Sequence, residues 1–78
     1  DSQLIQKIIQ LALEDKRILG VHDVMAHSYG PGNVFASVHI EVPSTLTLIK
    51  AHFIANHLEY VLEQKLDLQA TVHRNVTR

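Results

Sequence analysis

Apolar and polar positions follow helical spacing at the start of the chain. Apolar residues recur from Leu4 to Ala12 at the spacing of one helix face, after Asp1 and Ser2, which can cap a helix start. This pattern predicts a helix from about Ser2 to Asp15, with Gly20 in the loop that follows.

The next segments show the period-two pattern of strands. "YGPGN", residues 29–33, is dense in turn formers and predicts a hairpin after a short strand over about residues 24–29. Beyond it, apolar and other residues alternate strictly, which predicts a strand with one face in a core. Its core-facing positions are Val34, Ala36, Val38, Ile40 and Val42.

A long second helix is expected after Pro43, capped by Ser44 or Thr45 and running to about Lys65. Its predicted core stripe is Leu48, Ala51, Ala55, Leu58, Leu62 and Leu66. A weaker apolar stripe, Ile49, Phe53 and Tyr60, lies elsewhere on this helix. Such a patch either meets a partner or is ordinary surface.

The last segment alternates again, with Ala70, Val72 and Val76 facing one way and Thr71, His73 and Asn75 the other. The element order is therefore α-β-β-α-β. A strand–helix–strand unit makes the last two strands parallel, and we expect them to be neighbours. The predicted fold is α+β, with two helices on one face of a three-stranded mixed sheet.

Composition limits the class of protein. The chain has 78 residues, 46% hydrophobic, and no apolar run near the length of a membrane span, so we expect one soluble domain over residues 1–78. It has no cysteine, which leaves a metal or oligomerisation to support a small core. A formal net charge of −1 disfavours a nucleic-acid partner. Because it starts at Asp1 and shows no signal peptide, we expect a piece of a longer protein.

The sequence contains no recognisable catalytic motif. There is no glycine-rich phosphate loop, no H-E-x-x-H helix and no nucleophile in a known context, so we expect no enzyme.

Six histidines are the main candidates for chemistry. His39 and His73 lie on the side of their strands that faces away from the core, so on neighbouring strands their imidazoles project from one face and could share a metal. Two solvent-facing histidines are the equal alternative. His52 sits at one edge of the helix stripe, as a packing histidine or a ligand, and His57 is expected at the surface.

The stretch "VHDVMAH" brings His22 and His27 close in sequence. They differ by five positions, so in one regular strand they would face opposite ways. We place His22 in the loop before the strand and His27 on the outward side. The spacing therefore argues against a ligand cluster within this stretch.

"GVHDVMAHSYGPGNVFASVHIEV", "LTLIKAHFIANHLEYVLEQKL" and "ATVHRN" resemble, in order and spacing, the C-terminal cytoplasmic domain of cation diffusion facilitator (cation efflux) transporters. These are membrane exporters of Zn2+ and related divalent ions. The resemblance implies a metallochaperone-like (ferredoxin-like) sandwich that forms a homodimer at the cytoplasmic face of the membrane. It also implies a transmembrane domain in the same polypeptide, and metal binding that regulates transport.

The resemblance also implies a metal site. Carried over residue by residue, the family's ligands fall on His22, His39, His52 and His73, whereas His27 and His57 match none. The implied ion is Zn2+, with Cd2+, Mn2+ or Fe2+ as other divalent cations. The family often has Asp or His where this chain has Asn75, a poorer and uncharged ligand, which predicts a weaker or singly occupied site. Asp23 could substitute.

Three alternatives remain open. The first is a metal-independent oligomerisation module of the same fold. The second is a free-standing metal carrier, disfavoured because carriers of this fold generally use a Cys-x-x-Cys loop and the chain has no cysteine. The third is a small-molecule sensor, for which the sequence offers no pocket signature.

Overall fold

The computed structural model describes the backbone of residues 2–77 and the side chains of residues 2–75. Its elements are α1 (Ser2–Leu13), β1 (Gly20–Ser28), β2 (Val34–Pro43), α2 (Leu48–Leu66) and β3 (Gln69–Thr77). The order is the α-β-β-α-β order that the sequence predicts.

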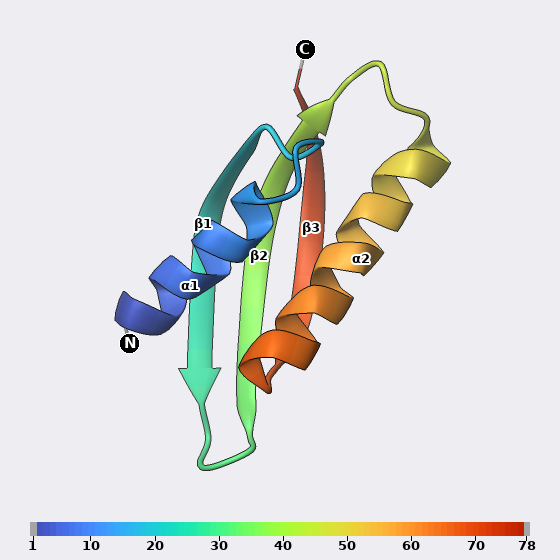
Figure 1. Cartoon of the computed structure of the whole chain (residues 1–78). Helices are drawn as coiled ribbons and strands as arrows, with labels where there is room; N and C mark the ends of the chain where they lie inside the picture. Colours follow the sequence, from blue (N-terminus) through green and yellow to red (C-terminus); the bar gives the residue numbers. More distant parts are fainter. Residues whose placement is uncertain (1, 78) are drawn as a thin grey trace.

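The three strands form one mixed sheet in the order β1-β2-β3. β1 pairs antiparallel with β2 through the hairpin, and β2 pairs parallel with β3 across the α2 connection. Both helices lie against the same face of the sheet, α1 over β1 and α2 beside β3 (Figure 1). The predicted α+β architecture is therefore confirmed, and no element of residues 2–77 covers the second face of the sheet.

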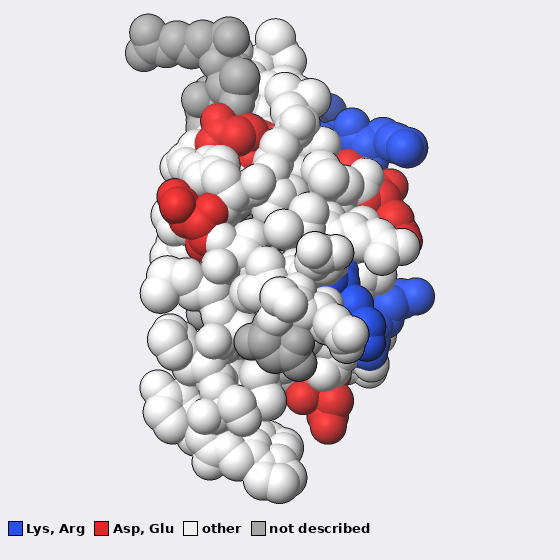
Figure 2. All heavy atoms as spheres, turned by 90° about the vertical axis from the view of Figure 1, so that its left-hand side faces the viewer, with Lys and Arg blue, Asp and Glu red and all other residues white. Residues whose placement is uncertain are grey.

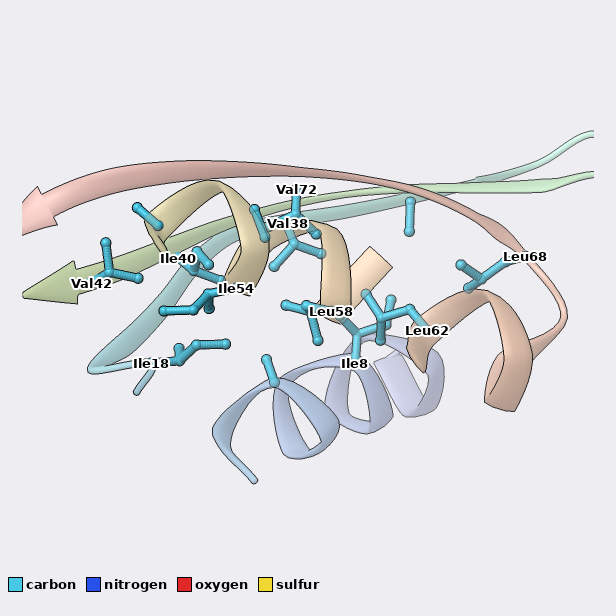
Figure 3. Close-up of a cluster of buried hydrophobic side chains, with 14 residues drawn as sticks. Ile8, Ile18, Val38, Ile40, Val42, Ile54, Leu58, Leu62, Leu68 and Val72 are labelled. Carbon is cyan, nitrogen blue, oxygen red and sulfur yellow. The ribbon is translucent and has the colours of Figure 1, made fainter. Parts of the chain in front are cut away.

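The core lies between the sheet and the helices (Figure 3). Val38, Ile40 and Val42 on the central strand are fully buried, because alternate side chains of a strand project to one face. Ile8 of α1 and Leu62 of α2 are also fully buried against them. The alternation read in residues 34–42 is thus the main signal that fixes which face of the sheet is covered.

The second helix begins later than predicted. Residues 44 and 45 form a turn, and Thr47, in an extended conformation (φ −67°, ψ 158°), is the N-cap. Its hydroxyl accepts a hydrogen bond from the backbone N–H of Lys50 at 3.1 Å. Leu48 is consequently the first helical residue and is 75% exposed, so its assignment to the core stripe was wrong.

We predict that Thr47→Ala destabilises the domain by about 1 kcal/mol, since it leaves an N-terminal N–H of α2 without its acceptor. The matched control is Thr45→Ala, which removes the same hydroxyl from an exposed turn position and is expected to change stability by less than about 0.5 kcal/mol. Urea unfolding of both variants measures this. Equal losses would contradict the assignment of Thr47 as the cap.

The first strand also begins earlier than predicted, at Gly20 instead of near Val24. Its register with β2 shifts between His22 and Met25, which marks a β-bulge, and Asp23 there has a positive φ of 52°. Aspartate tolerates this left-handed conformation better than most residues. The bulge explains why the sequence pattern did not predict the first residues of β1, because one extra residue breaks the period-two pattern.

We expected the side chain of Val76 to face the core, and this side chain lies outside the described ones. Its backbone pairs with Val42 in the parallel register.

Candidate metal centre on the open face of the sheet

A row of three imidazoles crosses the uncovered face of the sheet. His22 on β1 pairs with His39 on β2, and His39 pairs with His73 on β3, so each strand contributes one ring at the same level. The ring centres of His22 and His39 are 5.6 Å apart, and those of His39 and His73 are 4.8 Å apart. His22 therefore lies within β1 and not in the preceding loop.

The bulge in β1 changes which residues share this face. Because the extra residue shifts the alternation by one, His27 lies on the same face as His22, opposite Phe35 on β2. The expectation that His22 and His27 would face opposite ways was wrong for this reason. His39 is four positions from Phe35 along β2, about 13 Å, so His27 is still too far away to share one metal with the row.

Both ring nitrogens of His22 contact carboxylates. Nε2 lies 2.8 Å from Oε2 of Glu41, and Nδ1 lies 3.0 Å from Oδ2 of Asp23. Only the protonated ring can donate hydrogen bonds at both positions. These bonds, that to Glu41 first and that to Asp23 second, raise the pKa of His22 above its ordinary value.

In metal-free protein, we expect NMR titration of His22 to give a midpoint above that of a histidine in an unfolded peptide, and Glu41→Gln to lower it. A raised pKa in the folded state means that the protonated form is favoured by folding. Its contribution to stability is therefore complete below the unfolded-state pKa and is lost as the pH rises through the folded-state pKa. A midpoint at or below the peptide value would contradict the two hydrogen bonds.

His52 lies on the helix side of β3, away from the row. Its Nδ1 is 3.5 Å from Nη1 of Arg74, and its Nε2 is 3.0 Å from the side-chain nitrogen of Asn56 one turn along α2. Arg74 follows His73 directly in β3, so the two side chains project to opposite faces of the sheet. Within this chain, the structure thus brings together three of the four predicted ligands and not His52. His57 is exposed on α2, as expected.

The donor chemistry of the row fits a divalent metal, although the side chains do not yet converge. Two imidazoles on one metal have ring centres about 5 Å apart, given metal–nitrogen distances of about 2.0–2.1 Å. The two separations in the row fall on either side of this value. Among the described side chains, however, no three His, Asp or Glu groups are arranged to hold an ion as they stand. The rings of His39 and His73 stack at 23° and would have to turn.

The surroundings of the row are acidic. Two carboxylates flank it. Asp23 lies at the level of His22, and Glu41 lies one outward-facing position beyond His39. Seen from the β1 side, the margin that belongs to the open face carries acidic side chains, whereas the helix-side margin carries Lys and Arg together with further acidic side chains (Figure 2). Clustered negative charge favours the approach of a cation.

Sequence reasoning missed Glu41, which contacts His22 directly. A signal was present: Glu41 follows His39 by two positions in a strand whose alternation was recognised, so the two share the outward face. Asn75, the Cα partner of Glu41 on β3, lies on this face as well.

Comparison with known proteins identifies the class of the domain. The model of the cation efflux protein cytoplasmic domain, named ZT_dimer, matches residues 1–75. The chain therefore belongs to this family, whose members are dimerisation domains of transporters rather than enzymes. This confirms the resemblance and the expectation that the chain is not an enzyme.

Individual relatives agree with this class. The cation-efflux pump FieF of Salmonella newport (strain SL254) is 32% identical over 60 residues, which is 77% of this chain and 20% of the pump. FieF of Salmonella typhi is 32% identical over 57 residues, 73% of this chain and 19% of the pump. The chain thus spans about a fifth of the length of these relatives. No helix in the described part of the chain is long and apolar enough to cross a bilayer.

Solved structures share the whole fold. CzrB, a candidate zinc transporter, has a TM-score of 0.89 and 28% identity, with coverage of 100% of this chain and 98% of that chain. Its zinc form has a TM-score of 0.83 at the same 28% identity, covering 95% and 85% of the two chains. A variant of the MamM C-terminal domain has a TM-score of 0.89 at 19% identity, covering 99% of this chain and 98% of that one.

Proposed function

We propose that this chain is the metal-sensing and dimerisation domain of a divalent cation efflux transporter of the zinc type. The observation that carries the proposal is the row of His22, His39 and His73 across the open face of a domain of the cation efflux family. Because the matched segment is only 20% of the relative's length, the proposal includes a transmembrane part in the same polypeptide and a position at the cytoplasmic face of the membrane.

Zinc is the ion that the donor set favours. Neutral imidazole suits Zn2+, and the chain has no thiolate to select Cu+ or an iron–sulfur cluster. The zinc form of the related CzrB supports the same choice. Cd2+, Mn2+ and Fe2+ are the other divalent cations we consider, and Mn2+ is the least suited because it prefers oxygen donors.

His52 enters the proposal through a second subunit. It lines an exposed hollow of about 300 Å³ together with Leu48, Ile49, Phe53 and Arg74. The three apolar residues of this hollow are largely exposed, and such patches commonly mark protein contacts. In a dimer formed through this end of α2, His52 would lie at the contact between the two subunits.

Metal binding would regulate the domain by joining its strands and its subunits. Ligands from β1, β2 and β3 connect the two edges of the sheet across its central strand, so the ion stabilises one arrangement of the open face. If that arrangement fits the second subunit better, metal shifts the monomer–dimer equilibrium. A longer transporter would sense the ion through this shift.

Sedimentation equilibrium with Zn2+ and with a chelator tests the proposal. We expect the dimer dissociation constant to fall by at least about tenfold when Zn2+ is present, corresponding to about 1.4 kcal/mol of coupling. A monomer under both conditions at high concentration would contradict dimerisation. A dimer of equal strength under both conditions would favour a metal-independent oligomerisation module, which is supported by the lack of three converged donors among the described side chains.

A further inference from the structure

Glu41 lies beside the imidazole row, and its carboxylate is half-buried on the open face. We propose that Glu41 is itself a metal ligand of this chain, supplying the negatively charged donor that Asn75 cannot supply. This inference rests on the proposed metal site. It adds one residue to that site and gives Asp23 a different role.

The register of the sheet supports the proposal that Glu41 takes the place of a carboxylate at position 75. Glu41 and Asn75 are Cα partners in the parallel pairing of β2 with β3, one outward-facing position beyond His39 and His73. Neighbouring strands are about 4.8 Å apart, a distance that the longer glutamate side chain can span. Glu41 directs its carboxylate to His22 on the β1 side, whereas a carboxylate at position 75 would border the row from the β3 side, so both positions lie one outward-facing position beyond the row on the open face.

The contacts of His22 distinguish the roles of the two acidic residues. A metal-bound imidazole uses one nitrogen for the ion and donates its other N–H to a carboxylate or carbonyl, which orients the ring. Asp23 contacts Nδ1 of His22 at 3.0 Å from the adjacent position, where the bulge fixes its backbone. Asp23 is thus suited to orient the ring and to leave Nε2 to the ion.

Glu41 contacts the remaining ring nitrogen of His22, Nε2. Its Oε2 lies 2.8 Å from Nε2 of His22, and it comes from a different strand. In the metal-free protein, the N–H at Nε2 of His22 donates its proton in a hydrogen bond to this carboxylate oxygen. A divalent cation that replaces this proton would bind the imidazole nitrogen and the carboxylate oxygen together, while the proton leaves to solvent. The bond of the metal-free state therefore holds both donors side by side for the ion.

The carboxylate also changes the charge of the site. Three neutral imidazoles leave a bound divalent ion with its full charge, whereas one carboxylate reduces the net charge to +1. Carboxylate oxygen is an ordinary ligand of Zn2+ beside histidine nitrogen. Replacement of Glu41 by glutamine keeps the size of the side chain and removes this charge.

The test compares the Zn2+ affinity of the wild type and four variants by competition with a chromophoric chelator. We expect Glu41→Gln to weaken binding by at least about 100-fold, and Asp23→Asn by about 10-fold because it acts through His22. Adding Asn75→Asp to Glu41→Gln is expected to restore affinity to within about tenfold of the wild type, because it returns a carboxylate to the open face, one outward-facing position beyond His73. Glu14→Gln, on the surface after α1, is the matched control and should bind as the wild type does.

A spectroscopic signal separates a ligand from a neighbour. The chemical shift of bound ¹¹³Cd reports the donor atoms, so it should change in Glu41→Gln and return toward the wild-type value when Asn75→Asp is added. Unchanged affinity in Glu41→Gln, or a loss that Asn75→Asp does not relieve, would overturn the assignment of Glu41 while leaving the histidine site intact. Failure of the wild-type domain to bind Zn2+ or Cd2+ at all would instead contradict the proposed function.

Discussion

A His39→Ala, His73→Ala double variant is expected to lose Zn2+ affinity by more than about 100-fold relative to the wild type. These two rings come from neighbouring strands and have their centres 4.8 Å apart, so they are the closest pair of nitrogen donors on the open face. Removing both leaves His22 with carboxylates, which cannot complete a nitrogen-rich site. Competition titration with a chelator measures the loss.

The double variant should still fold, because both side chains project away from the core. A matched double variant, His27→Ala with His57→Ala, removes two exposed imidazoles that lie outside the row and should bind Zn2+ as the wild type does. Circular dichroism of both variants checks the fold. Equal affinity in the wild type and in His39→Ala, His73→Ala would contradict the proposed metal centre.

Leu62→Ala is expected to destabilise the domain by about 2–5 kcal/mol, a large share of the stability of so small a domain. Leu62 is fully buried between α2 and the rest of the core, beside Ile8 of α1. Truncation removes apolar contacts and leaves a cavity that the surrounding rigid sheet only partly fills. Alanine is a good helix former, so the loss reports packing and not helix propensity.

The control for this variant is Leu19→Ala, which makes the same change at a side chain that is 56% exposed. We expect it to change the free energy of unfolding by less than about 0.5–1 kcal/mol. Urea denaturation of metal-free protein at several concentrations measures both variants and separates folding from dimerisation. Similar losses in the two variants would show that Leu62 is not a core residue.

The fold could be predicted because its central strand has an unbroken alternation. The burial of Val38, Ile40 and Val42 follows directly from the period of a strand, and the hydrophobic stripe of α2 follows from that of a helix. The start of β1 could not be predicted in the same way. The bulge at Asp23 inserts a residue with a positive φ, and no local pattern distinguishes this from a loop. The predicted start of α2 was wrong because three residues with hydroxyl groups, Ser44, Thr45 and Thr47, could each serve as the N-cap.

The candidate site was predictable where it depended on periodicity and not where it depended on register. His39 and His73 were expected on one face from their strand positions, and the parallel register confirms that they are neighbours. His22 joins them through an antiparallel register that the sequence did not reveal. Glu41 was not among the predicted ligands, although its position two residues after His39 places it on the same face of the strand.

The most direct measurement is an NMR titration of the metal-free wild-type domain with Zn2+, following the ring nitrogens of all six histidines. We predict that the ligating nitrogens of His22, His39 and His73 shift together and saturate at a common Zn2+ concentration. His52 should follow only where the dimer forms, and His27 and His57 should stay unchanged as internal controls. No shift at the three rings of the row, or equal shifts at His27 and His57, would contradict the account.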